Sequence, residues 1–316
     1  MQAVAVRRFR GTPELMDLPV PVAVPGELLV RVHFAGVNPF DWKIADGVLE
    51  GHRPHVFPLI LGVDAAGTVA KVGEEVDRFQ VGDKVVGQFL HDPVGTGTYA
   101  ELTTVPQSIG VVKVPAELPL PEAAALPTAG MTALAALDAL RLSRGASLLL
   151  VGASGGVGSF VTALAGPQGI RVTALARESS SARLRAMGVA ETVDPTTSDP
   201  VETMRRRHPS GFDGLIDVMS DRTGFDRYAT LVRGGGTALT TTYVADVRAL
   251  ERSGRRGVNL DLQPNAELLG KLIRQFIEHR LPVPLERRVR LSEAPAALAE
   301  LKMGHGHGKT VIELPT

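Results

Sequence analysis

The segment Ser147–Phe160, SLLLVGASGGVGSF, has the residue types of a phosphate-binding turn. Ser147–Val151 is a short apolar run that predicts a strand buried on both faces, and an apolar helix is expected after the glycines. Such a turn lets backbone N–H groups approach a pyrophosphate, whose negative charge the helix N-terminus stabilises. The residues expected to bind a dinucleotide here are Gly152, Ala153, Ser154, Gly155, Gly156, Val157 and Gly158.

Ala153 stands where a strict G-x-G-x-x-G pattern has glycine, so the bare pattern is not met. The prediction therefore depends on the order of strand, turn and helix, which is the required order. The alternative is a glycine-rich loop that binds nothing.

The residues after the next predicted strand, Arg171–Leu175, bear on the choice of dinucleotide. In this type of fold an Asp or Glu at the end of the second strand binds the ribose diol of NAD and would repel a 2′-phosphate. Ala176 occupies that position. Because guanidinium groups pair well with phosphate, we expect NADPH, bound with the help of Arg177, Ser181 and Arg183. The alternative is a solvated helix N-terminus with serine caps.

Composition restricts the class of protein. The chain has 316 residues, which suggests two domains, and 44% of them are hydrophobic, as in ordinary globular proteins. Lys plus Arg and Asp plus Glu each number 34, so the charge does not indicate a nucleic acid or an anionic membrane as partner. The start, MQAVAVRRFRG, lacks a signal-peptide core and no apolar run is long enough to span a membrane, so we expect a cytoplasmic protein.

The hydrophobic pattern changes along the chain. Residues 1 to about 118 predict many short strands between Gly and Pro turns, typical of a small barrel or sandwich. Strands and helices alternate from residue 121 to about 244, which predicts a parallel, doubly wound sheet, and Thr240 at the end of one of these strands is a further candidate for cofactor contact. The C-terminal part predicts helices at 265–279 and 293–303 and strands at 287–291 and 309–314.

Seven segments in this order resemble the medium-chain dehydrogenase/reductase superfamily, in its zinc-independent quinone oxidoreductase and enone reductase branch. They are MQAVAVRRFRGTPE at the start, GVNPFDWKIADG (36–47), GVDAAGTVAKVG (62–73), VGDKVVG (81–87), AALPTAGMTALAAL (124–137), GASGGVGS (152–159) and HGKTVIEL (307–314).

The resemblance implies an α/β protein with a GroES-like β-barrel catalytic domain and a Rossmann domain with a doubly wound parallel sheet, and NADPH and substrate in the cleft between them. We expect the catalytic domain at 1–118, completed by about 281–316, and the NADPH-binding domain at 119–280. The resemblance also implies a homodimer, in which Rossmann sheets pair through an edge strand. Gly257–Leu262 is the candidate for that strand.

The same resemblance implies catalysis without a metal. Zinc-dependent alcohol dehydrogenases have Gly-His-Glu where this chain has Gly62-Val63-Asp64, and the chain contains no cysteine. His305 and His307 lie close together, but histidines flanked by glycine near a terminus are more often a solvated turn. We therefore expect no metal site, and we interpret Asp64 as a residue that holds its loop by hydrogen bonds.

The family places Asn38 and the residues after it against the nicotinamide. Asn38, Asp41 and Lys43 are the catalytic candidates, in an N-P-x-D-x-K pattern that resembles enone and alkenal reductases. An ammonium group near the substrate carbonyl would stabilise an enolate after hydride reaches the β-carbon. The alternative for Lys43 is a surface lysine paired with Asp41 or Asp46.

Two further candidates for cofactor contact come from the resemblance. Thr128 follows Pro127 at the break between two predicted helices, where its alternative role is a helix N-cap. Lys309 belongs to the family's terminal Gly-Lys element, and its alternative is a solvated position.

These features predict an NADPH-dependent reductase of activated C=C bonds in enones or alkenals, or of quinones. One alternative is a discrete enoyl reductase of polyketide or fatty-acid-type biosynthesis. Another is a protein that binds NADPH without catalysis.

Overall fold

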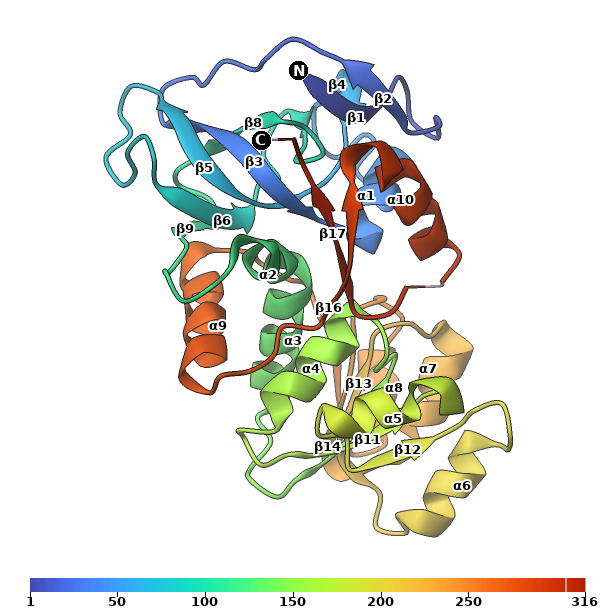
Figure 1. Ribbon diagram of the computed structural model, residues 1–316. Coiled ribbons are helices and arrows are strands. Elements are labelled where there is room, and N and C mark those ends of the chain that lie inside the picture. Colours follow the sequence, from blue (N-terminus) through green and yellow to red (C-terminus); the bar gives the residue numbers. More distant parts are fainter. Residues whose placement is uncertain (305, 316) are drawn as a thin grey trace. The chain divides into compact units, whose positions relative to one another are not determined.

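The computed structural model of the protein describes residues 1–304 and 306–315. Its internal contacts divide the chain into two compact units, Met1–Met131 with Pro264–Thr316, and Thr132–Gln263 (Figure 1). The expected α/β class is confirmed, with a β-rich first unit and a parallel, doubly wound second unit. No helix in the described part of the chain combines the length and the apolar character needed to cross a membrane.

The first unit contains two sheets. One has the strand order β2 (Glu14–Asp17), β1 (Gln2–Val6), β4 (His55–Ile60) and β7 (Val94–Thr96). The other has the order β16 (Leu285–Arg290), β17 (Lys309–Glu313), β3 (Glu27–Gly36), β5 (Asp64–Val72), β6 (Lys84–Gln88) and β9 (Val111–Lys113), and β8 (Leu102–Pro106) also pairs with β3. The C-terminal strand β17 lies antiparallel to β3, so the end of the chain joins the N-terminal strands, as expected.

A short helix in the first unit was not expected from the sequence. The sequence predicts only strands before residue 118, whereas Pro39–Ala45 form the helix α1. Its start signals are local: Asn38 is the N-cap, and Pro39 follows at the first helical position, where its missing N–H costs no hydrogen bond. The pair Asn-Pro therefore begins a helix here instead of a turn.

The second unit is a six-stranded sheet with every strand parallel to its neighbours. Its order is β12 (Glu191–Val193), β11 (Arg171–Leu175), β10 (Ser147–Val151), β13 (Phe212–Asp217), β14 (Val232–Thr240) and β15 (Arg256–Asn259). The helices are α4 (Gly156–Ala165), α5 (Glu178–Ala186), α6 (Pro200–Arg207), α7 (Arg222–Ala229) and α8 (Val247–Arg252). The order 3-2-1-4-5-6 reverses between β10 and β13, and in such sheets ligands bind beyond the carboxyl ends of the strands at the point of reversal.

The two units have other boundaries than the expected domains. Helix α2 (Leu120–Ala125) packs on β3, β5 and β17, and α9 (Ala266–Glu278) packs on β9, so both belong by contacts to the first unit. Gly130, in α3 (Pro127–Leu140), also lies against α9, because a Cβ there would be 2.6 Å from Leu272 Cδ2. The assignment of 119–280 to cofactor binding stays a prediction about function.

The remaining helix of the first unit, α10 (Ala294–Lys302), follows a 3₁₀ turn, Leu291–Glu293. Its residues Ala294, Ala297 and Leu298 belong to the buried core of the first unit, which also contains Ile44 and Ala45 of α1. Helices α1 and α10 are therefore anchored to one core, and α1 presents its N-terminus at a fixed place in the unit.

Candidate active site

The N-terminus of α1 organises a buried polar cluster in the first unit. Asn38 precedes the helix with an extended backbone, and Asp41 in the first turn accepts a hydrogen bond from Asn38 N through Oδ2, at 2.7 Å. This is one half of a capping box, which fixes the carboxyl group relative to the chain entering the helix. Both residues are fully buried.

Asn38 connects this helix with two distant parts of the chain. Its Oδ1 accepts a hydrogen bond from Lys309 Nζ at 2.6 Å, and its Nδ2 donates to Asp64 Oδ2 at 2.9 Å. Lys309 Nζ also donates to Val37 O at 2.8 Å. Because both ends of the Asn38 amide are engaged, this side chain positions its neighbours, and its expected place against the nicotinamide stays a prediction.

Asp64, the first residue of β5, holds the start of α3. Its Oδ1 accepts a hydrogen bond from Thr128 Oγ1 at 2.7 Å, and its Oδ2 accepts from Thr128 N at 3.0 Å. The Thr128 hydroxyl also accepts from Gln88 Nε2 at 2.7 Å. The structural role expected for Asp64 agrees with these bonds, and they direct the Thr128 hydroxyl toward Asp64.

Tyr99 completes the cluster, and the sequence analysis missed it. Its hydroxyl donates to Asp41 Oδ2 at 2.7 Å. Its backbone is held by Leu61 O and passes close to Gly62, where a Cβ would lie 2.3 Å from Tyr99 Cδ1. Gly62 also has a φ of +88°, so only glycine fits both the backbone and the ring. Tyr99 lies between β7 and β8, and no local motif identifies such a residue from the sequence alone.

Burial shifts the acid–base equilibria of this cluster. It raises the pKa of Asp41 to about 7, although the hydrogen bonds from Tyr99 and Asn38 N lower it, and the charge of Asp64 raises it further. Burial also raises the pKa of Asp64 and lowers that of Lys309. Each of these three pKa shifts favours the uncharged form, and burial is the largest cause of each.

Lys309 does not lie at an open surface. It is 2% exposed, and both of its described hydrogen bonds go to the Val37–Asn38 segment. The burial of its ammonium excludes the solvated position considered as the alternative, and contact with a cofactor stays a prediction. We assign Lys309 a positioning role, in which strand β17 holds the chain that enters α1.

Lys43 lies outside the cluster. Its side chain is exposed on α1, with Nζ 5.7 Å from the centroid of the Trp42 ring. The second ammonium near this ring is Lys302 Nζ, at 5.1 Å, and Lys302 pairs with Asp46 at 2.6 Å. Neither Asp41 nor Asp46 is therefore paired with Lys43, because Asp41 bonds to Tyr99 and Asn38 and Asp46 bonds to Lys302.

The residues of this unit do not fit a zinc ion. Val63 has no donor atom, and no cysteine thiolate is available. Among residues 1–304 and 306–315 no group of three or more His, Cys, Asp or Glu side chains could hold a metal. His307 is exposed, and His305 lies outside the described residues. We therefore derive no chemical step through a metal.

The glycine turn of the second unit has the geometry that an anion requires. Gly152 has a φ of +87°, and a Cβ on Gly158 would lie 2.2 Å from Gly152 O, so glycine is required at both positions. Gly155 is the N-cap of α4 and brings no side chain to the first turn of the helix. The first N–H groups of α4, at Gly156, Val157 and Gly158, have no partner within the helix. The residues fit the pyrophosphate of a dinucleotide.

Ala153 is compatible with this turn. Its side chain is fully buried, and Ser159 Oγ donates to its carbonyl at 3.4 Å. The next carbonyl, of Ser154, accepts a hydrogen bond from Arg183 Nη2 at 3.0 Å. Arg183 therefore ties α5 to the turn.

The residues predicted to bind a phosphate after β11 differ in their exposure. Ala176 and Arg177 lie at the end of the strand as expected, and Arg177 is exposed. Ser181 is 2% exposed and its hydroxyl bonds to Thr192 Oγ1 at 2.6 Å, so its contact with a phosphate stays a prediction. Asp194 lies nearby: it accepts from Glu178 N at 2.8 Å, and the charge of Arg177 helps to lower its pKa. The sequence analysis did not identify this acid.

Thr240 ends β14 and is fully buried. Its hydroxyl accepts a hydrogen bond from Thr242 N at 3.0 Å, and Thr242 Oγ1 donates to Ser220 O at 3.0 Å. These bonds join the loops after β13 and β14 at the carboxyl edge of the sheet, so Thr240 shapes this edge.

The structure thus brings together Asn38, Asp41, Thr128 and Lys309 from the candidates, adds Asp64 and Tyr99, and leaves Lys43 at the surface. The candidates of the second unit form the glycine turn, follow β11, end β14 or lie on α5.

Comparisons with known proteins agree with this architecture. An alcohol dehydrogenase GroES-like domain model matches residues 24–116, and a zinc-binding dehydrogenase model matches residues 187–312. The chloroplast envelope quinone oxidoreductase homolog of Arabidopsis thaliana is 31% identical over 314 residues, which cover 95% of this chain and 93% of that protein. A 2-methylene-furan-3-one reductase of Solanum lycopersicum is 30% identical over 321 residues, covering 96% and 76%. The solved quinone oxidoreductase of Coxiella burnetii superposes with a TM-score of 0.89, at 28% identity, covering 100% of this chain and 99% of that one.

Proposed function

Because the chain belongs to the medium-chain dehydrogenase/reductase superfamily, in its quinone oxidoreductase-like branch, we propose that it is an NADPH-dependent, zinc-independent reductase of activated C=C bonds or quinones. The family makes it an oxidoreductase. The observation that supports a dinucleotide cofactor is the turn Gly152–Gly158, which precedes the uncapped first N–H groups of α4. When bound, a nicotinamide cofactor supplies the hydride, and the protein supplies position and electrostatics.

The preference for NADPH rests on the end of β11. Ala176 offers no carboxylate to the ribose diol, and the exposed Arg177 offers a guanidinium to a 2′-phosphate. Asp194 opposes this preference, although its Oδ2 is directed to Glu178 N. We assign Arg177 the larger effect, because its side chain is exposed and Asp194 is already bonded.

The choice of substrate class rests on the relatives and on the first unit. One of the two relatives is named a quinone oxidoreductase homolog, and the other is named a 2-methylene-furan-3-one reductase. Reduction of an enone places negative charge on the carbonyl oxygen, which a positioned cation or hydrogen-bond donor stabilises. Lys43 is exposed and not paired with Asp41 or Asp46, so we assign this role to its ammonium.

The role of Lys43 has a matched control on the same surface. Lys43→Met is expected to lower kcat for an enone by about 10²–10³ with little change in NADPH affinity. Lys302, the other ammonium near Trp42, pairs with Asp46, and Lys302→Met is expected to retain the parental kcat. Equal rates for Lys43→Met and the parent would contradict the assignment.

We also propose a homodimer formed through β15. This strand is the edge of the six-stranded sheet, and it comprises Arg256–Asn259 where the sequence predicts 257–262. An unpaired edge invites pairing with a second copy. Light scattering at micromolar concentration should give twice the mass of 33.5 kDa, and a monomer would contradict the proposal. A cytoplasmic location stays a prediction.

The direct test follows NADPH absorbance after exhaustive chelation, with an enone, an alkenal, a quinone and an enoyl thioester as substrates. We expect turnover with the enone, alkenal or quinone that EDTA does not reduce. Turnover restricted to the enoyl thioester would identify the enoyl reductase alternative. NADPH binding without turnover of any substrate would identify a non-catalytic binding protein.

A further inference from the structure

Asp41 uses only one of its two carboxyl oxygens in the cluster. Oδ2 accepts hydrogen bonds from the Tyr99 hydroxyl and from Asn38 N, both at 2.7 Å. Oδ1 is buried and has no hydrogen-bond partner in the part of the chain that the structure describes. A buried oxygen without a partner is costly, so this atom calls for a ligand, a water molecule or a bound proton.

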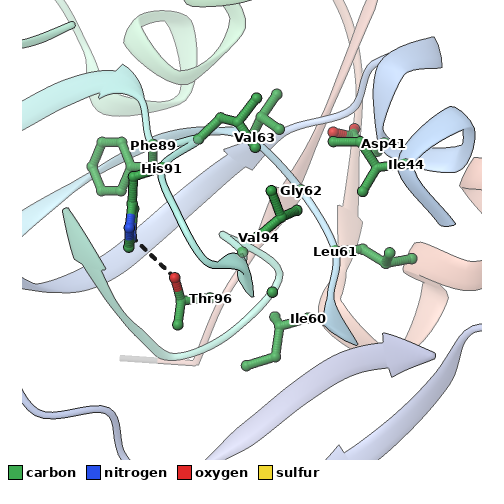
Figure 2. Close-up of a pocket in the computed structure, with 13 residues that line it drawn as sticks. Asp41, Ile44, Ile60, Leu61, Gly62, Val63, Phe89, His91, Val94 and Thr96 are labelled. Atoms are coloured by element: carbon green, nitrogen blue, oxygen red, sulfur yellow. Dashed lines mark hydrogen bonds between the residues drawn. The ribbon is translucent and has the colours of Figure 1, made fainter. Parts of the chain in front are cut away.

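A cavity lies beside Asp41. It has a volume of about 20 Å³, which is room for one water molecule. Figure 2 shows Asp41 and Ile44 on one side of this cavity, with Phe89 and His91 on the opposite side. Leu61, Val63 and Val94 add apolar lining, so a water molecule here has Asp41 as a strong polar neighbour in an otherwise mostly apolar surrounding.

The proton of Asp41, a residue that lines this cavity, belongs on Oδ1, the oxygen without a hydrogen-bond partner among the described residues. Burial raises the pKa of Asp41 to about 7, so at neutral pH a large share of the molecules carries the protonated acid. Oδ2 already accepts from two donors, and a proton there would oppose both of them. Oδ1 has no such donor, so a proton there points away from Tyr99 and Asn38.

Other titratable groups around Asp41 are engaged. The Tyr99 hydroxyl donates to Asp41, and burial raises its pKa well above the ordinary value. Asp64 accepts at both oxygens from Thr128, and Lys309 donates to Val37 and Asn38. His91, across the cavity, lies within hydrogen-bond distance of Thr96 Oγ1 and of the Thr104 and Asp92 carbonyls.

We propose that Asp41 is the acid that completes the reduction, delivering the proton on Oδ1 through a water molecule in this cavity. The proposal rests on the proposed function. Two electrons arrive with the hydride at the β-carbon, and the C=C electron pair moves toward the carbonyl to give an enolate. The water then gives a proton to the α-carbon and takes the proton of Asp41, which becomes a carboxylate. Asp41 regains a proton from solvent before the next turnover.

Asp41→Asn separates the proton from the shape of the side chain. The amide oxygen still accepts from Tyr99 and Asn38 N, and an NH₂ group that cannot deliver a proton takes the place of Oδ1. With an enone, kcat is expected to fall roughly 10²–10⁴-fold, the usual contribution of a positioned acid, and its dependence on pH near 7 is expected to disappear. The matched control is Asp46→Asn, on the same helix but paired with Lys302 at the surface, which is expected to retain the parental rate.

A second variant shifts the pKa of Asp41 instead of removing the titrating group. The Tyr99 hydrogen bond lowers the pKa of Asp41, so Tyr99→Phe is expected to shift the pH dependence of kcat to higher pH. A merely structural role of Asp41 would leave the pH profile in place in both variants. Infrared spectroscopy detects the proton on Asp41 without turnover. The parent is expected to show a protonated-carboxyl band that titrates near pH 7, and Asp41→Asn is expected to lack it.

The outcomes distinguish the two levels of the proposal. An active parent together with an equally active Asp41→Asn variant of unchanged pH profile would overturn the role of Asp41 and leave the proposed function intact. A parent that reduces no enone would overturn enone reduction and the role of Asp41 with it. A parent without the infrared band would overturn the claim that Asp41 stores the proton.

Discussion

The polar cluster of the first unit and the glycine turn of the second use hydrogen-bonding groups in opposite ways. In the cluster, Asn38 and Lys309 are buried and their described hydrogen bonds go to neighbours in the same unit. In the turn, the first N–H groups of α4 are left without helical partners, and glycine keeps side chains away from them. Polar groups that make their hydrogen bonds within the protein position a site, whereas polar groups without such partners bind a ligand.

This comparison predicts a large loss of stability for Lys309→Met in the first unit. Methionine would leave Val37 O and Asn38 Oδ1 buried without their donor and would remove the cation that faces Asp41 and Asp64. The expected loss is about 3–5 kcal/mol in the free energy of unfolding, measured by urea titration.

The control for this substitution is Lys302→Met, which removes a surface pair with Asp46 and should cost less than about 1 kcal/mol. Equal stability of the two variants would show that the cluster does not hold the first unit together.

Asp41→Asn should change stability in a pH-dependent way. The folded-state pKa of Asp41 is about 7 against an ordinary 3.8, so the folded protein binds the proton more tightly than the unfolded chain. The resulting stability is fully present below about pH 4 and is lost as the pH rises through 7. Asparagine at position 41 does not titrate, so the variant does not lose this contribution. The free energy of unfolding of the variant should therefore exceed that of the parent by an amount that grows to roughly 4 kcal/mol above pH 8.

Unfolding of both proteins at several pH values measures this difference, and the comparison at about pH 4 is the internal control. An advantage that did not change with pH would mean that Asp41 titrates at its ordinary value in the folded protein.

In the second unit, Gly158→Ala should abolish most cofactor affinity. Its Cβ would lie 2.2 Å from Gly152 O, so the turn must open. We expect NADPH to bind roughly 100-fold more weakly, about 2.7 kcal/mol, as measured by calorimetry. Gly166→Ala, at the other end of α4, meets its nearest atom at 3.9 Å and should bind NADPH like the parent. Unchanged affinity in Gly158→Ala would show that the turn is not the dinucleotide site.

The smallest expected effects concern the selection between the two cofactors. Arg177→Ala should weaken NADPH binding by about 1.5–3 kcal/mol and leave NADH binding unchanged, because only NADPH carries a phosphate for the guanidinium. Asp194→Asn should act in the opposite direction by removing a negative charge near Arg177. Equal affinity of the parent for NADPH and NADH would contradict the assignment of Arg177.

The sequence predicts the second region better than the first for a physical reason. The turn is a contiguous segment, and its strand, glycines and helix follow one another from Ser147 to Phe160. The cluster joins residues as distant as Asn38 and Lys309, which only the pairing of β17 with β3 brings together. Periodicity along the chain contains no information on such pairing.

Side-chain direction explains the remaining differences. Ser181 was expected at a phosphate, but the helix α5 turns it toward Thr192 of β12. Tyr99 and Asp194 were missed because neither belongs to a local motif, and each acts on a residue from another element. The helix α1 had a local signal in Asn38-Pro39, which a two-residue turn shares.

The central claim is hydride transfer from NADPH to an activated C=C bond without a metal, and isotope labelling tests it directly. The chelated protein is supplied with NADPH deuterated at the transferred position and with an enone, and the product is analysed by NMR. The account predicts one deuterium on the carbon β to the carbonyl and a hydrogen from solvent on the α-carbon. Deuterium on the carbonyl carbon, or turnover that appears only after zinc is added, would contradict it.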